Sequence, residues 1–421
     1  MAATKVREAM ADSPVILLHG ARQCGKSTLA EAIADHAGVP VRTFDDVETY
    51  RFAIEDPKGF VAAIGPASRD GYTPAVLDEI QRVPEIFTTI KASVDRFRYP
   101  GRFLVTGSSN VLTLPKLSDS LAGRMEVIDL YPLSQGEIEG VRDGFVDAVF
   151  ADKFAPDADY RDDRLIERTV RGGFPEPALR RSHSRLSTWF EGYVRTMIDR
   201  DVRDIANIEH STNLHRMLAL IAQRAGSPLN KQSISSDAGL PNSTADRYFE
   251  LLASVFFIHR VYPWWTNASA KLVRSPKVYV QDSGLLCALL DANVATLEKN
   301  RQLFGLVLEN FIAGELRKQV SWADRKVNLL FLRTARQQEV DFVLEDAAGR
   351  VVAIEARAAA TIQAADLRGM RFLRELAGER FVRGFFLYTG TEPILVDRDV
   401  WALPVSALWR LGFQPHRDAG S

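Results

Sequence analysis

A glycine-rich stretch near the start of the 421-residue chain constrains its fold more strongly than any other feature. It follows a short apolar run at residues 15–18 and precedes residues 29–33, which favour a helix. Strand, glycine loop and helix are the context in which the G-x-x-x-x-G-K-[ST] pattern binds phosphate. The residues of the stretch are, in order, Gly20, Ala21, Arg22, Gln23, Cys24, Gly25, Lys26, Ser27 and Thr28.

The residue types of this loop suit a nucleoside triphosphate. Glycines let the backbone curl so that successive N–H groups point at phosphate oxygens, and the helix N-terminus adds partial positive charge. Lys26 can reach the β- and γ-phosphates, and the Ser27 hydroxyl can ligate Mg²⁺. The stretch therefore predicts a site for ATP and Mg²⁺ in which residues 20–28 bind the nucleotide and Lys26 also assists catalysis.

A second apolar run begins at residue 75 and leads into two adjacent carboxylates, Asp78 and Glu79. Asp78 is placed to hold the Mg²⁺ of ATP, and Glu79 to polarise the attacking water as a general base. Carboxylates also end many ordinary strands. Their position after a phosphate-binding loop favours the catalytic interpretation.

Polar residues follow the next predicted strand, residues 102–107. Ser108 or Asn110 could sense the γ-phosphate at the strand tip, with Asn110 in a catalytic role, or both could be ordinary turn formers. The alternation of strands and helices predicts a parallel sheet that binds nucleotide at the carboxyl ends of its strands.

Arg124 follows a loop rich in serine and aspartate. It could supply positive charge to the transferring phosphoryl group, in its own or a neighbouring subunit of a homo-oligomer. The other interpretation is a surface arginine ahead of a strand.

Five short motifs lie in order between about residues 20 and 135: Gly-Ala-Arg-Gln-x-Gly-Lys-Ser, Leu-Asp-Glu-Ile-Gln-x-Val-Pro, Thr-Gly-Ser-Ser, Leu-Ala-Gly-Arg and Tyr-Pro-Leu-Ser. Together they resemble the prokaryotic AAA-type ATPases that carry a C-terminal domain of unknown function. The resemblance implies a P-loop AAA-type domain that binds and hydrolyses ATP. Cys24 departs from the small or aliphatic residue usual in that family, and it adds an oxidisable thiol.

Composition limits the other functions. The net charge of −1 provides no global field for nucleic acid, so any DNA binding must come from a local patch. The only two cysteines, Cys24 and Cys287, make no disulfide framework, and the sequence has no apolar run long enough for a membrane span. We expect a cytoplasmic protein without a membrane partner.

The chain length predicts several domains. We expect an α/β multidomain protein: a three-layer αβα ATPase domain at residues 1–138, a helical connector at 139–210, a winged-helix-like domain at 211–292 and a nuclease-like α/β domain at 293–421.

The winged-helix prediction depends on three helices, the third at residues 242–261, followed by strands at 272–273 and 277–280. Ser243, Thr244 and Arg247 near the start of the third helix would then face DNA. The segment is not strongly basic, so the domain could instead serve only for packing.

Three acidic residues of the C-terminal part could converge. A predicted hairpin carries Asp341 and Glu355, and a preceding helix carries Glu309. They would form a second Mg²⁺ site, since side chains alternate along a strand. The pattern resembles the restriction-endonuclease-like core with its Asp…Glu-x-Lys signature, but Arg357 stands where that signature has lysine. A fold with a decayed site and an active metal-dependent nuclease both remain open.

The leading functional prediction is an ATPase whose nucleotide state rearranges the winged-helix and nuclease-like half. The alternative is a nucleotide-switched DNA-binding or defence module with a degenerate or weakly active nuclease site.

Overall fold

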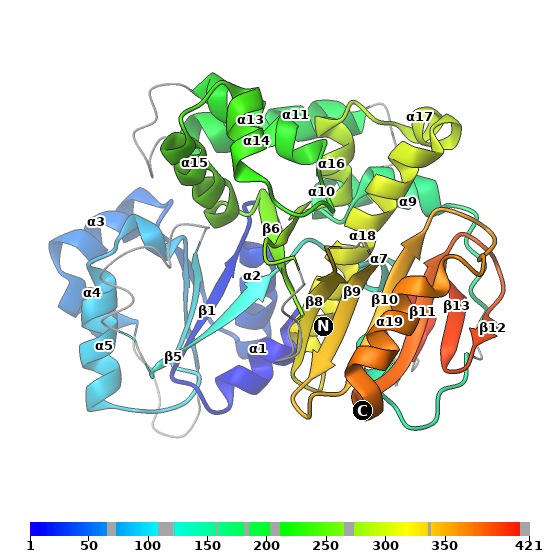
Figure 1. Ribbon diagram of the computed structural model, residues 1–421. Coiled ribbons are helices and arrows are strands. Elements are labelled where there is room, and N and C mark those ends of the chain that lie inside the picture. Colours follow the sequence, from blue (N-terminus) through cyan, green and yellow to red (C-terminus); the bar gives the residue numbers. More distant parts are fainter. Residues whose placement is uncertain are drawn as a thin grey trace. The chain divides into compact units, whose positions relative to one another are not determined.

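The computed structural model describes residues 1–64, 73–107, 121, 123–156, 159–180, 185–202, 211–264, 273–335 and 338–412 (Figure 1). The chain divides into two compact units. The first comprises Met1–Pro132 and Ser254–Phe256, and the second Leu133–Ala253 and Phe257–Ser421. The segments that we predicted as connector, winged-helix and nuclease-like domains thus lie almost entirely in the second unit. The four-part division itself stays a prediction.

The first unit contains a five-stranded, all-parallel sheet, as the sequence predicts. Its strand order is β2-β3-β4-β1-β5. The strands are β1 (Val15–Gly20), β2 (Val41–Thr43), β3 (Ala75–Asp78), β4 (Phe103–Gly107) and β5 (Met125–Leu130). The helices are α1 (Ala2–Met10), α2 (Lys26–Ala37), α3 (Val47–Glu55), α4 (Pro57–Ala63) and α5 (Ile86–Arg96).

Strand β1 explains the three-layer arrangement of this unit. Its side chains alternate between two buried clusters, since successive residues of a strand point to opposite faces. Val15 and Leu17 pack with residues of α4 and α5, whereas Ile16 and Leu18 pack with residues of α1 and α2. A strand buried on both faces reads as a continuous apolar run.

The second unit contains an eight-stranded mixed sheet with the order β12-β13-β11-β10-β9-β8-β6-β7. Its strands are β6 (Ile258–Pro263), β7 (Lys277–Val280), β8 (Val327–Arg333), β9 (Glu339–Asp346), β10 (Val351–Arg357), β11 (Phe381–Tyr388), β12 (Ile394–Asp397) and β13 (Val400–Pro404). The predicted hairpin is confirmed, because β9 and β10 pair antiparallel.

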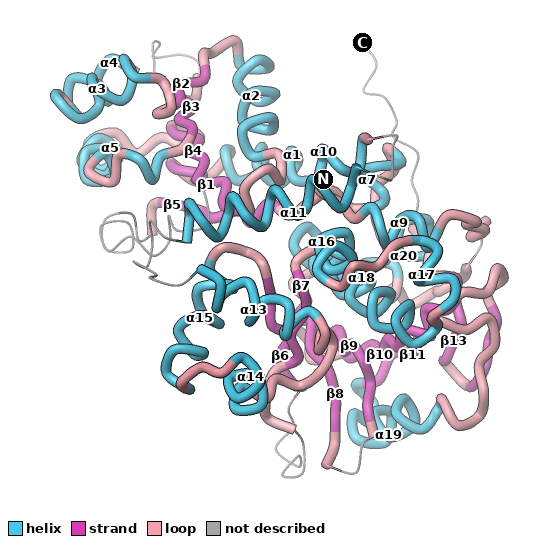
Figure 2. Tube along the Cα trace, turned by 90° about the horizontal axis from the view of Figure 1, so that it is seen from above, coloured by secondary structure: helices cyan, strands magenta, loops and turns pink. Residues whose placement is uncertain are grey.

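Helices cover both faces of this sheet (Figure 2). Figure 2 shows α18 (Arg301–Trp322) and α19 (Leu367–Ala377) on opposite faces of it. The remaining helices are α7 (Gln135–Glu139), α8 (Phe145–Ala148), α9 (Leu165–Arg171), α10 (Pro175–Leu179), α11 (Leu186–Thr196), α13 (Ser211–Ala222), α14 (Lys231–Ala238), α15 (Asn242–Ser254), α16 (Ser283–Leu289), α17 (Val294–Lys299) and α20 (Ala407–Arg410).

The predicted winged-helix segment has the expected strand at Lys277–Val280, but its third helix is shorter than predicted and an unpredicted strand follows that helix. The helix expected to reach residue 261 ends at Ser254, and β6 begins at Ile258. Phe256 has a left-handed φ of 60°, which turns the chain out of the helix. β6 then pairs antiparallel with β7 and parallel with β8. Tertiary pairing has therefore overridden the helical pattern of the sequence, and the two sheets expected to be separate are one.

Trp264 shows how closely the two parts of the second unit combine. It follows β6, is fully buried, and packs in one cluster with Leu332, Val340 and Met370. Its indole Nε1 donates a 3.0 Å hydrogen bond to Glu345, which satisfies the one polar group of a buried tryptophan.

Candidate ATP site and the acidic cluster

The glycine loop of the first unit lies where β1 ends and α2 begins, as predicted. A Cβ atom on Gly20 would lie 2.2 Å from the carbonyl oxygen of Leu130, so only glycine fits there. Gly25 has a φ of 101°, a conformation that favours glycine. Gln23 also adopts a left-handed φ, of 60°. The loop is therefore tightly curled, and the backbone of the neighbouring strand β5 leaves no room for a side chain at Gly20.

Lys26 is the first residue of α2 and is buried. Its Nζ donates hydrogen bonds to the carbonyl oxygens of Gly20, at 3.1 Å, and Ala21, at 2.8 Å. The ammonium group thus lies against the loop that it is predicted to serve. Thr28, one position beyond Ser27, is exposed at the start of the helix.

Cys24 packs inside the loop. It is 2% exposed, and its Sγ donates to the carbonyl oxygen of Leu130 at 3.4 Å. Burial raises the pKa of the Cys24 thiol, although Lys26 acts in the opposite direction. Because the reactive form of cysteine is the thiolate, this environment protects the thiol from oxidation.

Ser27 and Asp78 meet although 51 residues separate them in sequence. The Ser27 hydroxyl lies 3.0 Å from Asp78 Oδ1 and 3.2 Å from Oδ2. β3 places Asp78 at the carboxyl end of the parallel sheet, the edge where β1 leads into the loop. A hydroxyl and a carboxylate side by side supply the oxygen ligands that Mg²⁺ prefers. These residues fit the Mg²⁺ that the sequence predicts.

Sequence reasoning missed Thr106, which holds both predicted carboxylate residues. This buried residue of β4 donates its hydroxyl hydrogen to Asp78 Oδ1 and accepts a 3.1 Å hydrogen bond from the backbone N–H of Glu79. The signal was its place in the Thr-Gly-Ser-Ser motif, at the end of a strand parallel to β3. Parallel neighbours align their carboxyl ends, so the two motifs had to be close.

Glu79 itself has an unusual backbone, with a left-handed φ of 59° directly after β3. Its half-buried side chain accepts a hydrogen bond from the amide of Gln81. A non-glycine residue in this region marks local strain, which clusters at functional sites.

Arg124 does not join this site within its own chain. It precedes β5, and the register Val15↔Met125 places it at the amino end of the sheet. The glycine loop lies beyond Gly20 at the other end of β1, roughly 16 Å further along the strands. Arg124 Nε instead pairs with Asp95 of α5 at 2.5 Å. This position contradicts a role in its own subunit, whereas a role in a neighbouring subunit and an ordinary surface arginine both stay predictions. Ser108 and Asn110 lie outside the described residues.

The acidic residues of the second unit do converge, but around a lysine. Lys277 Nζ of β7 lies 3.0 Å from Glu309 Oε1, 2.7 Å from Glu339 Oε1 and 3.3 Å from Asp341 Oδ1. Sequence reasoning missed both Lys277 and Glu339. Among the described residues, no group of three or more His, Cys, Asp or Glu side chains could hold a metal ion. A lysine ammonium thus lies between Glu309 and Asp341, where the sequence predicts a second Mg²⁺.

Glu355 of β10 pairs with a different cation from Asp341. It is 3% exposed, and one of its oxygens pairs with Arg357. Burial raises the pKa of Glu355 well above its ordinary value, while Arg357 acts to lower it. Asp341 instead accepts a 3.0 Å hydrogen bond from the backbone N–H of Ala356. Asp341 and Glu355, which we expected to share a metal, are thus each bound by groups of the protein.

The Tyr-Pro-Leu-Ser motif takes part in a buried polar network of the second unit. Lys318 of α18 pairs with Glu315 at 2.7 Å and donates to the carbonyl oxygen of Leu133 in the Tyr-Pro-Leu-Ser motif. Asp282 accepts a 2.7 Å hydrogen bond from Gly173 N–H and caps α16. These contacts join α18, α16 and the start of the second unit.

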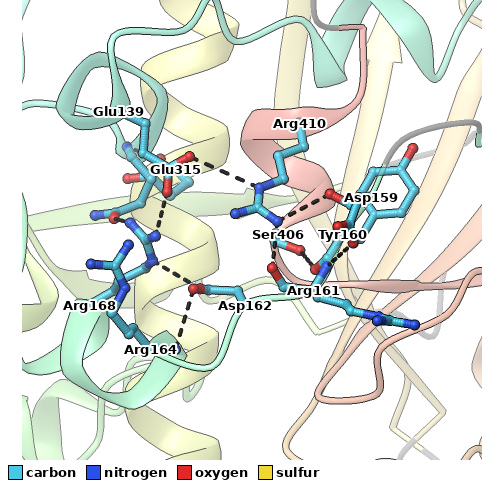
Figure 3. Close-up of polar contacts among 11 residues, drawn as sticks. Glu139, Asp159, Tyr160, Arg161, Asp162, Arg164, Arg168, Glu315, Ser406 and Arg410 are labelled. Atoms are coloured by element: carbon cyan, nitrogen blue, oxygen red, sulfur yellow. Dashed lines mark hydrogen bonds and ion pairs between the residues drawn. The ribbon is translucent and has the colours of Figure 1, made fainter.

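A cluster of charges joins the segment after α7 to the C-terminal end of the unit. Figure 3 shows Arg168 directed toward Glu139 and Asp162, and Arg410 toward Glu139. Ser406 also donates its hydroxyl hydrogen to the carbonyl oxygen of Tyr160. Residues that we assigned to a separate connector are therefore bound to the last helix described.

The fold and the loop define the first unit as a P-loop ATPase-like domain of the AAA type. Residues 12–139 match the model of an AAA domain family, residues 162–296 a domain of unknown function (DUF8612) and residues 304–408 another (DUF4143). In the described residues, no helix is both long and apolar enough to cross a membrane.

The chain is similar along nearly its whole length to uncharacterized proteins of Mycobacterium. Mb2031c of Mycobacterium bovis and Rv2008c of Mycobacterium tuberculosis are each 29% identical to it over 98% of this chain and 84% of theirs.

Solved structures with partial similarity include a Walker-type ATPase and a branch migration motor. The Walker-type ATPase of Pyrococcus abyssi is 14% identical, with a TM-score of 0.43 over 69% of this chain and 94% of that one. The RuvB Holliday junction branch migration motor of Thermotoga maritima is 19% identical, with a TM-score of 0.29 over 62% and 88%.

Proposed function

We propose that the first unit binds ATP together with Mg²⁺ and hydrolyses it to ADP and phosphate. The observation that carries this proposal is the contact between Ser27 and Asp78, 3.0 Å apart. It unites the end of the glycine loop with the acidic strand end, the two places from which P-loop ATPases hold the metal of their nucleotide.

The chain's residues divide the work of such a reaction. Backbone N–H groups of residues 20–28 would bind the phosphates, and Lys26 would balance the charge on the β- and γ-phosphates. Ser27 and Asp78 would hold Mg²⁺, which when bound neutralises charge on the phosphate oxygens. Glu79 would accept a proton from the attacking water. The water oxygen then bonds to the γ-phosphorus as the bond from that phosphorus to ADP breaks.

A role for the second unit in this cycle is part of the proposal. The nucleotide state would rearrange the second unit. If Arg124 completes the ATP site of a neighbouring subunit, the active form would be a homo-oligomer. The alternative remains a nucleotide-switched DNA-binding or defence module. Ser243 and Arg247 of α15 are exposed. Asp246 and Glu250 of the same helix also pair with cations, so the helix presents no clear basic face.

Phosphate release by the purified full-length chain, with and without duplex DNA, tests these ideas. We expect Mg²⁺-dependent hydrolysis by the wild-type protein, and loss of hydrolysis with retained ATP binding in Glu79→Gln. Lys26→Ala should lose binding as well, because the loop then lacks its only lysine. The control is Lys326→Ala, since Lys326 is an exposed residue of the second unit.

The outcomes separate the alternatives. A wild-type chain that neither binds nor hydrolyses ATP, or a Lys26→Ala chain that binds it as before, would refute the proposal. Hydrolysis that rises with DNA would favour the DNA-binding alternative. Hydrolysis indifferent to DNA would direct the search toward protein partners.

A further inference from the structure

Lys277 is the centre of an ionic cluster in the second unit. Its side chain is 1% exposed, and its ammonium group lies within 3.3 Å of three carboxylates. Glu339 and Asp341 come from β9 and Glu309 from α18, so three separate elements meet at one nitrogen. An ammonium has three N–H donors, and three carboxylate oxygens are here to accept them.

A lone buried lysine would lose its charge, because burial penalises the ammonium form. Here the pKa of Lys277 is raised well above its ordinary value, since burial is outweighed by Glu309, Tyr279, Asp341 and Glu339. The lysine therefore stays charged. Removal of one member of such a cluster leaves buried charge without compensation.

The oxygens that Lys277 contacts include two of the three that we predicted as metal ligands. A Mg²⁺ or Mn²⁺ ion bonds carboxylate oxygens at about 2.1 Å and tolerates little distortion. A metal ion so close to Glu309 Oε1 and Asp341 Oδ1 would be repelled by the ammonium that contacts both. Tyr279 donates a further 2.8 Å hydrogen bond to the same Glu309 oxygen. The protein itself thus supplies the cation for these carboxylates, and Tyr279 adds a hydrogen-bond donor.

We infer that Lys277 is a built-in cation that takes the place of a divalent metal among Glu309, Glu339 and Asp341. The intact chain then binds no divalent metal at this cluster, and a chain with a neutral residue 277 does. The inference concerns the second unit alone and does not depend on ATP hydrolysis.

The measurement is Mn²⁺ binding to the full-length chain, by equilibrium dialysis at millimolar metal. An Asp78→Asn background removes the carboxylate of the first unit from the count. We expect no specific Mn²⁺ binding in this background, and about one Mn²⁺ per chain when Lys277→Met is added, because Glu309 and Asp341 then lose their cation while Glu339 keeps Arg333. Adding Asp341→Asn should abolish the gained site. The matched control is Lys326→Met, an exposed lysine next to β8, which should gain none.

Loss of the buried ammonium could prevent folding, so the melting transition of the Lys277→Met chain is recorded with Mn²⁺ and with EDTA. If the variant unfolds in EDTA, Mn²⁺ should restore a cooperative transition. The inference is overturned if the Asp78→Asn chain, with Lys277 intact, binds Mn²⁺ and Asp341→Asn abolishes that binding. It is equally overturned by a Lys277→Met chain that neither binds Mn²⁺ nor is stabilised by it.

Discussion

The backbone N–H of Glu79 donates a 3.1 Å hydrogen bond to the hydroxyl of Thr106, on the neighbouring strand. The same hydroxyl donates its own hydrogen to Asp78. One buried threonine therefore sets the positions of a proposed metal ligand and a proposed general base, and this relationship yields the first prediction.

Thr106→Val removes the hydroxyl but keeps the shape of the side chain. We expect kcat for ATP hydrolysis to fall about 10- to 100-fold, because supporting hydrogen bonds of this kind tune a metal site by such factors. ATP binding through the loop should change little. Steady-state hydrolysis and nucleotide titration measure the two effects separately. Thr106→Ser keeps the hydroxyl and should retain most of the activity, so an equal loss in both variants would contradict this role.

Gly20→Ala should disrupt the loop. The added Cβ would lie 2.2 Å from the Leu130 carbonyl oxygen, which is backbone and cannot move without shifting β5. We expect loss of ATP binding and a lower free energy of unfolding, by about 1–3 kcal/mol. Gly192→Ala is the control, since nothing lies within 4 Å of a Cβ at Gly192. Thermal unfolding and ATP titration check both variants, and normal ATP affinity in Gly20→Ala would refute the prediction.

Asp143 predicts a pH dependence of stability. Burial is the main cause that raises its pKa from 3.8 to about 8, followed by the charge of Glu315. The folded chain therefore holds a proton that the unfolded chain releases above pH 4. Between pH 4 and 8 this group should lower the free energy of unfolding by at most about 1.4 kcal/mol per pH unit.

Asp143→Asn should remove that slope, because an amide does not titrate and its oxygen can still accept the hydrogen bond from Ser134. Denaturant unfolding at several pH values between 5 and 9 measures it. The variant should gain stability relative to the wild type as the pH rises. Parallel profiles for the two proteins would show that Asp143 is ionised in the folded chain.

Arg168 should be important for stability. Its side chain is 9% exposed and pairs with Glu139 and Asp162, and it lies over the ring of Trp409. Arg168→Met leaves Asp162 without its cation and Glu139 with Arg410 at 4.0 Å, at a cost of about 3–5 kcal/mol. Arg161→Met is the control, because that side chain is 70% exposed and should contribute at most about 1 kcal/mol. Urea unfolding compares the two, and equal effects would contradict the prediction.

Local sequence signals were sufficient where function depends on a short segment. The glycine loop, the acidic end of β3 and the β9–β10 hairpin each occupy consecutive residues, and the structure has them as predicted. Thr106 and Lys277 were missed because their roles exist only once distant strands pair. Lys277 is 64 residues from Asp341, and no periodicity connects them. Glu309 and Asp341 were found, but the cation among them was misassigned as a metal for the same reason.

The parallel pairing of β6 with β8 crosses the boundary between the two families of unknown function that the second unit matches. Tyr262 and Trp264 belong to one matched segment and their partners on β8 to the other. A recombination event between the segments would thus leave unpaired backbone groups on both sides and remove Trp264 from its core. The two segments should therefore be inherited together, and any exchange of one should be accompanied by compensating change in the other.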